Sequence, residues 1–261
     1  MTDPAFADRY GPVALVTGAS SGIGLAFAEA LAAKGLGLVV AARRVERLED
    51  LAERLSGQHG VGVKIVEVDL ADPAAARVLL AATEALDVGL LVSNAGFGLK
   101  GDFAAGDAQA IADMLTVNCH APLQLAHGFI PRLRRRGKGG IILTSSVEAL
   151  MGVPYSTAYS ATKALVSAFG EGLWAELEGD GIDVLTLCPG ATESEAAGLQ
   201  GIDIAKLSHV MPAAEVAAST LENIRNGPTF FSSEVYRANF EKLLSMPRRD
   251  ALLMMAQAMK R

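Results

Sequence analysis

The residues most able to do chemistry in this chain are Tyr159 and Lys163, which stand four positions apart. On a helix this spacing places both side chains on one face, where they can meet. A tyrosine has an ordinary pKa of about 10, and a neighbouring ammonium favours the phenolate and lowers that pKa. A tyrosine shifted toward neutral pH can act as a general acid or base. The pattern alone is common by chance, so its interpretation depends on the residues that accompany it.

A glycine-rich turn near the start of the chain is typical of dinucleotide binding. The apolar run 13–17 predicts a buried strand, and 25–34 predicts an alanine-rich helix. Glycines between them let the backbone approach a pyrophosphate, and the helix N-terminus offers free N–H groups to it. The alternative, a glycine turn without a ligand, is disfavoured by the flanking strand and helix. The predicted contacts are Gly18, Ser20, Ser21, Gly22, Ile23 and Gly24.

The end of the second predicted strand indicates which dinucleotide is preferred. An acidic residue there would hold a ribose 2′-hydroxyl, but the strand ends in Ala41-Ala42-Arg43-Arg44. A guanidinium can pair with a 2′-phosphate, so the sequence predicts NADP(H) over NAD(H). This prediction depends mainly on Arg43, because Arg44 could equally be a solvated residue at the start of a helix.

Strands and helices alternate along the chain. This pattern predicts an α/β fold: a single-domain, Rossmann-like, doubly wound parallel sheet with helices on both faces. The predicted strands cover 13–17, 36–42, 62–68, 89–93, 140–145 and 182–188. The predicted helices cover 25–34, 45–55, a segment that starts at Asp72-Pro73, two pieces within 107–136 limited by Pro122 and Pro131, and 157–178.

The composition excludes several classes of protein. The 261 residues are 51% hydrophobic and carry a formal charge of −6, without a basic stripe, which argues against nucleic-acid binding. No signal peptide or transmembrane run is evident, and Cys119 and Cys188 have no metal-ligand spacing. The sequence therefore predicts a cytoplasmic protein with free thiols and no metal site.

Several motifs in order resemble the single-domain short-chain dehydrogenase/reductase family. The resemblance runs from about residue 13 to 190 and more loosely to 226. The motifs are Thr17 to Gly24, Asn94-Ala95-Gly96, Asn118, Ser146, Tyr159-x-x-x-Lys163 and Pro189-Gly190. The resemblance is specific for the family and says little about the substrate.

The resemblance implies a catalytic role for four residues. Tyr159 would be the general acid in carbonyl reduction and the base in alcohol oxidation. Lys163 would lower the tyrosine pKa and hold the nicotinamide ribose. Ser146, thirteen residues before Tyr159, would hold the substrate oxygen in preference to Ser145. Asn118 would complete a proton relay.

The resemblance also implies further cofactor contacts along the carboxyl ends of the strands. Asp69, with Leu70 after it, would accept from the adenine amino group, or would simply be a turn residue; the sequence leaves both open. The other implied contacts are Asn94, Ala95, Gly96, Tyr159, Lys163, Pro189, Gly190, Thr192 and Ser194.

Three loops, 97–103, 147–156 and 193–210, are expected to form the substrate pocket. They are largely apolar, and Glu148, Glu193 and Glu195 offer no cation to an anionic substrate, which favours an uncharged hydrophobic ketone or aldehyde. The alternative is that these apolar side chains fill core under the loops. The predicted substrate contacts are Ser146, Glu148, Met151, Tyr159 and Leu199.

The C-terminus departs from the family pattern. We expect a dinucleotide-binding domain over 1–232 and a helical extension over 233–261, basic and rich in methionine. The extension could cover the substrate cleft, extend a subunit interface, lie on a membrane surface, or pack on the protein's own body. A homodimer or homotetramer is expected, with a dimer contact through 125–136 and 165–177.

The sequence leaves two functions open. The first is an NADP(H)-dependent reductase or dehydrogenase that interconverts a carbonyl and an alcohol. The second is a dinucleotide-binding sensor on the same fold with weak catalysis, which would not need all four catalytic residues. A sugar-nucleotide epimerase is disfavoured, because the chain after Gly190 is short for the larger substrate domain usual in those enzymes.

Overall fold

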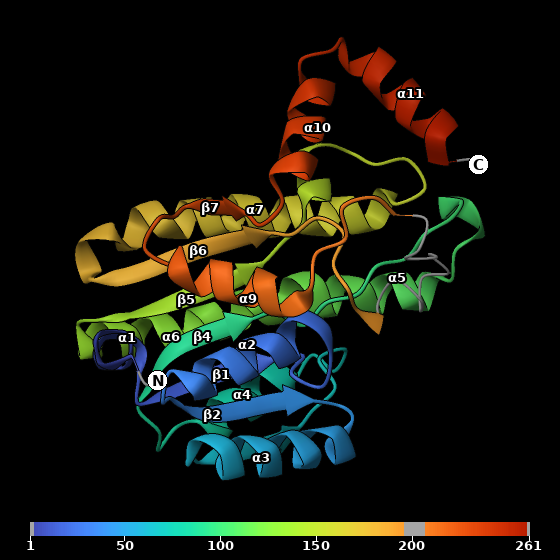
Figure 1. Ribbon diagram of the computed structural model, residues 1–261. Helices are drawn as coiled ribbons and strands as arrows, with labels where there is room; N and C mark the ends of the chain where they lie inside the picture. The colour runs from blue at the N-terminus through green and yellow to red at the C-terminus, as the bar shows by residue number, and fades with distance from the viewer. Residues whose placement is uncertain (1–2, 196–206, 260–261) are drawn as a thin grey trace.

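A computed structural model describes residues 3–195 and 207–259. In these residues seven strands form one sheet in the order β3-β2-β1-β4-β5-β6-β7 (Figure 1). Every neighbouring pair is parallel. The strands are β1 Val13–Thr17, β2 Gly37–Ala42, β3 Val63–Glu67, β4 Val88–Ser93, β5 Gly139–Thr144, β6 Ile182–Cys188 and β7 Thr229–Phe231. The order reverses between β1 and β4, and a ligand cleft is expected outside the carboxyl ends of strands at such a point.

Helices cover both faces of the sheet, which confirms the predicted doubly wound fold (Figure 1). One face carries α2 Gly22–Ala33, α3 Val45–His59 and α9 Ala213–Glu222. The other carries α4 Ala75–Ala82, α6 Ala121–Arg136 and α7 Thr157–Leu177. Side chains alternate between these faces along a strand: in β1, Ala14 and Val16 pack toward α2, while Leu15 packs on the α6 side.

The helical region between β4 and β5 differs from the prediction of two pieces broken near prolines. Helix α5 Ala108–Leu115 runs through a π-helical turn, η2 Thr116–His120, directly into α6. Pro122 falls in the first turn of α6, where its missing N–H costs little, and Pro131 lies inside α6 without ending it. The predicted start of α4 is also displaced, because Asp72 accepts from the Ala74 N–H and forms a turn ahead of the helix.

An N-terminal helix, α1 Pro4–Tyr10, was not predicted. Its signal was present in the sequence, since Asp3 accepts from the Phe6 N–H as an N-cap and proline occupies the first turn. Tyr10 is buried at the other end of α1, and its hydroxyl donates to Asp183 at 2.6 Å. The helix therefore closes the amino edge of the sheet, away from the carboxyl ends of the strands.

The predicted C-terminal extension is helical and rises from one corner of the body (Figure 1). It consists of α10 Glu234–Leu244 and α11 Arg248–Met259. Phe240 and Ala251 share an apolar cluster with Val147, Met151 and Val153. The extension thus packs on the segment that follows β5, which includes the 3₁₀ turn η3 Val147–Leu150. The domain boundary at 232/233 stays a prediction. No helix within 3–195 and 207–259 is long and apolar enough to cross a membrane.

Candidate active site

Tyr159, Lys163 and Ser146 converge at the carboxyl edge of the sheet. The first two lie in the opening turns of α7, as the spacing predicted, and the Lys163 Nζ is 5.7 Å from the centroid of the Tyr159 ring. Lys163 is buried and donates from Nζ to the Thr144 carbonyl at 2.8 Å. Ser146 follows β5, and its hydroxyl lies close enough to Tyr159 to lower the pKa of the phenol. A proton donor, a cation and a hydroxyl are therefore within reach of one another.

The two neighbouring serines have different surroundings. The Ser145 hydroxyl donates to the Lys163 carbonyl and pairs with the Ser167 hydroxyl at 2.8 Å. The Ser146 hydroxyl accepts from the Glu148 N–H at 3.1 Å and reaches Tyr159. Ser145 thus joins the strand to α7, whereas Ser146 lies on the Tyr159 side; the role of Ser146 toward a substrate oxygen, which the family resemblance implies, stays a prediction.

The pKa of Tyr159 is raised in this structure, contrary to the sequence expectation. Burial raises that pKa most, and the negative charge of Glu148 raises it further, while the hydrogen bond with Ser146 lowers it. The expectation relied on the Lys163 ammonium, but burial also lowers the pKa of Lys163, to about 8. The lysine therefore stands near its own midpoint just above neutral pH, and its charge does not offset the burial of the phenol.

Asn118 is buried in the π-helical turn, and its side chain is held by backbone. Its Oδ1 accepts from the Phe97 N–H at 3.0 Å, and its Nδ2 donates to the Phe97 carbonyl and to Thr162 Oγ1. A Cβ built at Gly96 would lie 3.1 Å from both Asn118 Oδ1 and Lys163 Nζ. The absence of a side chain at Gly96 therefore leaves room for both the amide and the ammonium, which lie against this position; the proton relay through Asn118 stays a prediction.

The glycine-rich turn leads from β1 into α2 and fits a dinucleotide. Gly18 has φ +71°, and a Cβ there would lie 2.9 Å from the Ala95 Cα. A Cβ at Gly24 would lie 2.3 Å from the Gly18 carbonyl oxygen. Within the described residues, the side chain of Ser21, the N-cap of α2, bonds none of the helix's first N–H groups. These donors and the positive end of the helix dipole are suited to a pyrophosphate.

Asn94 and Ala95 join the ends of neighbouring strands beside this turn. Both backbone N–H groups donate to Thr17 Oγ1, at 3.0 and 3.1 Å. The Asn94 side chain donates to the Thr17 carbonyl and accepts from Thr144 Oγ1. The motif therefore ties β1, β4 and β5 together at the point where the strand order reverses.

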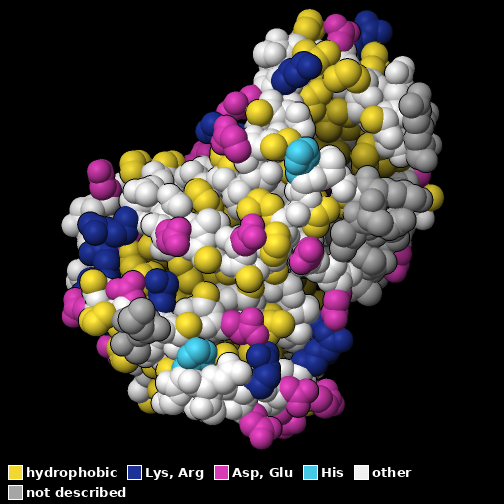
Figure 2. Space-filling view, in the orientation of Figure 1, with side chains coloured by type: hydrophobic (Ala, Val, Ile, Leu, Met, Phe, Trp, Pro, Cys, Tyr) yellow, Lys and Arg dark blue, Asp and Glu magenta, His cyan; other side chains and the backbone are white. Residues whose placement is uncertain are grey.

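The two arginines after β2 occupy different positions. The Arg44 guanidinium donates to the hydroxyls of Ser20 and Ser21 at 2.8 to 3.2 Å and forms an ion pair with Glu195 at 2.7 Å. The Arg43 side chain is 74% exposed, with Asp69 3.9 Å away. Figure 2 shows basic side chains next to acidic ones in the region of β2 and α3. Arg44 is thus the arginine fixed at the glycine-rich turn, although the predicted preference for NADP(H) depended mainly on Arg43.

The remaining predicted cofactor residues lie along the same edge. Asp69 accepts from the Ala71 N–H at 3.0 Å, a turn contact that its alternative interpretation expected. The Ser194 side chain lies against Gly22. The others lie as follows: Ile23 packs on the core, Leu70 is buried in it, Pro189 accepts from the Val147 N–H, and Thr192 donates to the Gly190 carbonyl.

Gly190 contacts the C-terminal extension. A Cβ built there would lie 2.5 Å from Tyr236 Cδ2. The Tyr236 hydroxyl donates to the Ser208 carbonyl at 2.9 Å. The first turn of α10 therefore packs directly on the backbone after β6, at the Pro-Gly motif.

Of the predicted substrate residues, Ser146 and Tyr159 lie together at the carboxyl edge of the sheet, as described above, and the others differ in their surroundings. Met151 is buried against the C-terminal extension. Leu199 lies outside the described residues. Glu148 has a partner that sequence reasoning missed, because Lys100 lies 2.7 Å away. Glu195 likewise pairs with Arg44 and Arg47. The sequence analysis saw no cation in these loops that could hold an anionic substrate, and the basic partners of Glu148 and Glu195 were not anticipated; only spatial proximity between separate loops could have revealed them.

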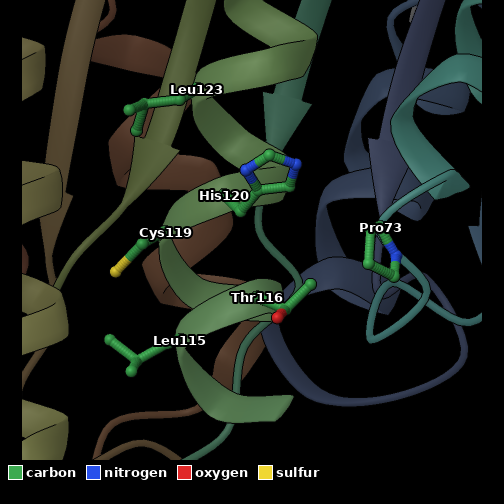
Figure 3. A pocket seen from close by; sticks show the side chains of 6 residues that line it. All are labelled: Pro73, Leu115, Thr116, Cys119, His120 and Leu123. Atoms are coloured by element: carbon green, nitrogen blue, oxygen red, sulfur yellow. The ribbon is translucent and has the colours of Figure 1, made fainter. Parts of the chain in front are cut away.

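Two surface hollows lie away from this site. One, of about 400 Å³, lies at the π-helical turn and the helix ends on either side of it (Figure 3); it is lined by Pro73, Leu115, Thr116, Cys119, His120 and Leu123. The other, of about 470 Å³, lies between α6 and α7 and includes Ile130, Phe169 and Leu173. Neither includes Tyr159 or the glycine-rich turn, so the candidate active site is defined by its residues. No cluster of His, Cys, Asp and Glu suited to a metal is present in the described part of the chain.

Comparisons with known proteins agree with a nucleotide-binding oxidoreductase fold. The family model described as short chain dehydrogenase matches residues 12–202. The 7beta-hydroxysteroid dehydrogenase of Collinsella aerofaciens is 31% identical over 207 residues, which are 77% of this chain and 79% of that protein.

Solved structures give the same result. A short-chain dehydrogenase from Sphingobium yanoikuyae in complex with NADPH has a TM-score of 0.83 and 34% identity, over 94% of this chain and 95% of that one. A short chain dehydrogenase/reductase from Burkholderia phymatum in complex with NAD has a TM-score of 0.80 and 26% identity, over 89% and 92%.

These findings define a nicotinamide-dinucleotide-binding oxidoreductase that acts on CH–OH or C=O groups. The chain belongs to the short-chain dehydrogenase/reductase family.

Proposed function

We propose that this protein is an NADP(H)-dependent carbonyl reductase or alcohol dehydrogenase with Tyr159 as general acid and base. The observation that carries the proposal is the convergence of Ser146, Tyr159 and Lys163 at the carboxyl edge of the sheet. The cofactor, when bound, supplies or accepts the hydride. In reduction Ser146 donates a hydrogen bond to the substrate oxygen, and Tyr159 gives it a proton. In oxidation the Tyr159 phenolate removes that proton.

Lys163 supports both the reduction and the oxidation through its positive charge and its position beside Tyr159. Its Nζ is fixed by the Thr144 carbonyl, so the ammonium stays near the Tyr159 ring rather than in solvent. The phenolate that remains when Tyr159 gives up its proton is stabilised by that positive charge, which counters part of the cost of burial. Asn118, beside Lys163 at Gly96, would extend the path for the proton, as the family resemblance implies.

The preference for NADP(H) is supported by the basic groups beside the glycine-rich turn. A 2′-phosphate at the end of β2 would meet Arg44, held by Ser20 and Ser21, and the exposed Arg43. The relative from Sphingobium yanoikuyae was solved with NADPH. NAD(H) is the competing cofactor, because the Burkholderia phymatum relative was solved with NAD.

The cofactor preference is tested by removing the arginines one at a time. Arg44→Met and Arg43→Ala should each weaken NADPH binding about 10- to 100-fold, the range of a charge-assisted contact to phosphate, while NADH affinity stays near that of the wild type. Arg47→Met is the matched control, because Arg47 shares Glu195 with Arg44 and has no contact with the serines. Equal losses for NADPH and NADH would contradict the 2′-phosphate assignment.

The substrate we propose is an uncharged, hydrophobic ketone or aldehyde, or the corresponding alcohol. The apolar cluster of Val147, Met151 and Val153 with α10 and α11 borders the segment that carries Ser146. Hydrophobic side chains also gather where α10 and α11 face each other (Figure 2). The Collinsella aerofaciens relative, named for a hydroxysteroid, supports a substrate of this kind.

The test is the consumption of NADPH and NADH with a panel of aliphatic, aromatic and steroid-like ketones. We expect NADPH oxidation with one class of ketone, and Tyr159→Phe should reduce turnover about 10²- to 10⁴-fold while NADPH affinity is unchanged. Unchanged turnover in Tyr159→Phe would rule out the assigned acid. Tight NADPH binding without turnover on the whole panel would favour the sensor alternative.

We also propose a homo-oligomer, with a dimer contact along α6 and α7, in a cytoplasmic setting. The hollow between these helices and the exposed Leu165 on α7 support such a contact. The thiols of Cys119 and Cys188 are free and buried, in keeping with a reducing compartment. Light scattering of the wild type and of Leu165→Glu would test the contact; a monomeric wild type would contradict it.

A further inference from the structure

The candidate active site contains a second lysine, Lys100, which belongs to the loop after β4. Its Nζ lies 2.7 Å from Glu148 Oε1 and 2.9 Å from the Ser156 hydroxyl, which in turn donates to Glu148 Oε2 at 2.6 Å. The Lys100 and Glu148 side chains are only 17% and 21% exposed. A partly buried charge pair with satisfied hydrogen bonds keeps its geometry far better than a surface pair.

This charge pair lies against the general acid and base. The Lys100 Nζ is 5.9 Å from the centroid of the Tyr159 ring, almost the same distance as the Lys163 Nζ at 5.7 Å. Both ammonium groups are within the range of a cation–π contact. The phenol ring therefore has two cations at similar distances, of which the family motif supplies only Lys163.

A backbone hydrogen bond joins the loop after β4, which carries Lys100, to the loop before α7, which carries Ser156. The Gly101 N–H, next to Lys100, donates to the Tyr155 carbonyl at 2.8 Å. Tyr155, next to Ser156, has φ +59°, a left-handed conformation that costs about 1 kcal/mol or more in a residue other than glycine. Such a conformation persists only where the surroundings enforce it, and here the bond to Gly101 and the charge pair do so.

We propose that Lys100 and Glu148 are positioning residues that act through Tyr159: Lys100 neutralises Glu148 beside the phenol and so sets the pH range in which Tyr159 exchanges its proton with the substrate. The inference rests on the proposed role of Tyr159 as general acid and base. Neither Lys100 nor Glu148 takes part in the proton transfer itself.

Among the described residues, charged and titratable groups from four different elements surround Tyr159. Lys163 is on α7 itself, Lys100 is in the loop after β4, Glu148 is in η3, and Cys188 ends β6. Glu148 raises the pKa of Tyr159, and the Cys188 thiol acts in the same direction. Lys100 is the group that holds the Glu148 carboxylate in an ion pair, so its loss leaves a negative charge uncompensated beside the phenol.

The two members of the pair should therefore shift activity in opposite directions. In alcohol oxidation the phenolate is the active form, so the rate rises with pH through the pKa of the site. Lys100→Met leaves Glu148 unpaired. The rising limb of the plot of kcat/KM against pH should therefore move to higher pH by about one unit. Glu148→Gln leaves Lys100 unpaired and should move it down by a similar amount. The double variant, with neither charge, should lie between the two.

Three controls separate this electrostatic role from a purely structural one. Lys138→Met removes a lysine paired with Asp8 on the surface and should leave the profile in place. Lys100→Arg keeps the positive charge, so the rising limb of the pH profile should stay at the pH of the wild type. If the pair were merely structural, both single variants would have a lower melting temperature and the rising limb of the pH profile would stay in place. That result would overturn the inference, as would a shift of the limb in the same direction for both variants.

A measurement without substrate keeps this inference distinct from the proposed function. Titration of the tyrosinate absorbance, taken as the difference between each variant and its Tyr159→Phe counterpart, reports Tyr159 directly. Opposite shifts for Lys100→Met and Glu148→Gln would support the inference even if no ketone on the panel turned over. Turnover with unshifted titrations would keep the proposed function and reject the inference.

Discussion

The candidate site at the carboxyl edge of the sheet has two parts that are built in different ways, a proposed cofactor side and a proposed substrate side. On the cofactor side, the turn after β1 packs glycine backbone directly on backbone, as at Gly24 and Gly18. On the substrate side, η3 is covered by α10 and α11 through apolar side chains, among them Met151 and Phe240. The first half is fixed by local sequence and sheet register, and the second by contacts between segments that are remote in the chain.

This difference has a consequence for how each half tolerates change. Backbone packed on backbone cannot yield, so a single methyl group disturbs the cofactor side. Side chains that pack on side chains can adjust, so the substrate side accepts substitution with graded effects. The cofactor half should therefore respond to mutation sharply and the substrate half gradually.

Gly24→Ala should have the largest effect. A Cβ at Gly24 would lie 2.3 Å from the Gly18 carbonyl oxygen and 2.5 Å from the Asn94 Nδ2, so the turn must shift. We expect a loss of about 1–3 kcal/mol in the free energy of unfolding and at least tenfold weaker dinucleotide binding, measured by denaturant unfolding and NADPH titration.

Gly172→Ala is the matched control for this substitution. Gly172 lies in α7, exposed, with no heavy atom near its would-be Cβ among the described residues. Alanine there should stabilise the protein by about 0.5–1 kcal/mol and leave NADPH binding unchanged. Similar losses in both variants would mean that the turn is not the sensitive element.

Lys163 marks the boundary between the two halves, and its burial should appear in the pH dependence of stability. Its pKa is lowered from 10.5 to about 8, so the unfolded chain binds more protons between these two values. The free energy of unfolding should therefore rise with pH through this window, and below pH 8 the full penalty should be present.

Lys163→Met should remove that dependence while abolishing turnover. At pH 7 we expect the variant to be more stable than the wild type by about 1–3 kcal/mol, and the advantage should disappear above pH 10. Thermal unfolding across this range measures it. Lys138→Met, with a half-exposed lysine, should change stability by less than about 0.5 kcal/mol. A pH-independent difference between Lys163→Met and the wild type would contradict the burial argument.

The smallest effect is expected for removal of α11 after Met246. The truncation uncovers part of the cluster around Phe240 and Met151, so KM for hydrophobic ketones should change several-fold while NADPH affinity is retained. Leu253→Ser, at a 53% exposed position on α11, is the control and should leave KM unchanged. Unchanged kinetics and unchanged mass in the truncated protein would mean that the extension only packs on its own body.

The cofactor half could be read from the sequence because its signals are local. Strands predicted at 13–17 and 182–188 match the observed bounds, and the spacing that favoured Ser146 over Ser145 agrees with their hydrogen bonds. The π-helical turn could not be predicted, because the propensities that favour an α-helix do not distinguish a single wider turn. Propensity likewise left open whether Pro131 ends a helix or lies inside one.

The sequence predicted the loops of the substrate side, but it did not reveal the pairing of Lys100 with Glu148, for a different reason. Lys100 and Glu148 are 48 residues apart in the chain, and neither belongs to a periodic pattern or motif. Their pairing depends on how the loops after β4 and β5 leave neighbouring strands of the sheet. The expected fall in the pKa of Tyr159 failed for a related reason, since burial is a property of the folded chain and not of the four-residue spacing.

The contact between Gly190 and Tyr236 has a consequence for redesign of this enzyme. The glycine of the Pro-Gly motif leaves room for the ring at the start of α10, so the residue serves the extension as well as the edge of the cleft. A tail taken from a relative is therefore not an exchangeable module: it must bring a side chain that fits over the bare backbone at position 190. Selection on either element constrains the other, and the two should be transplanted together.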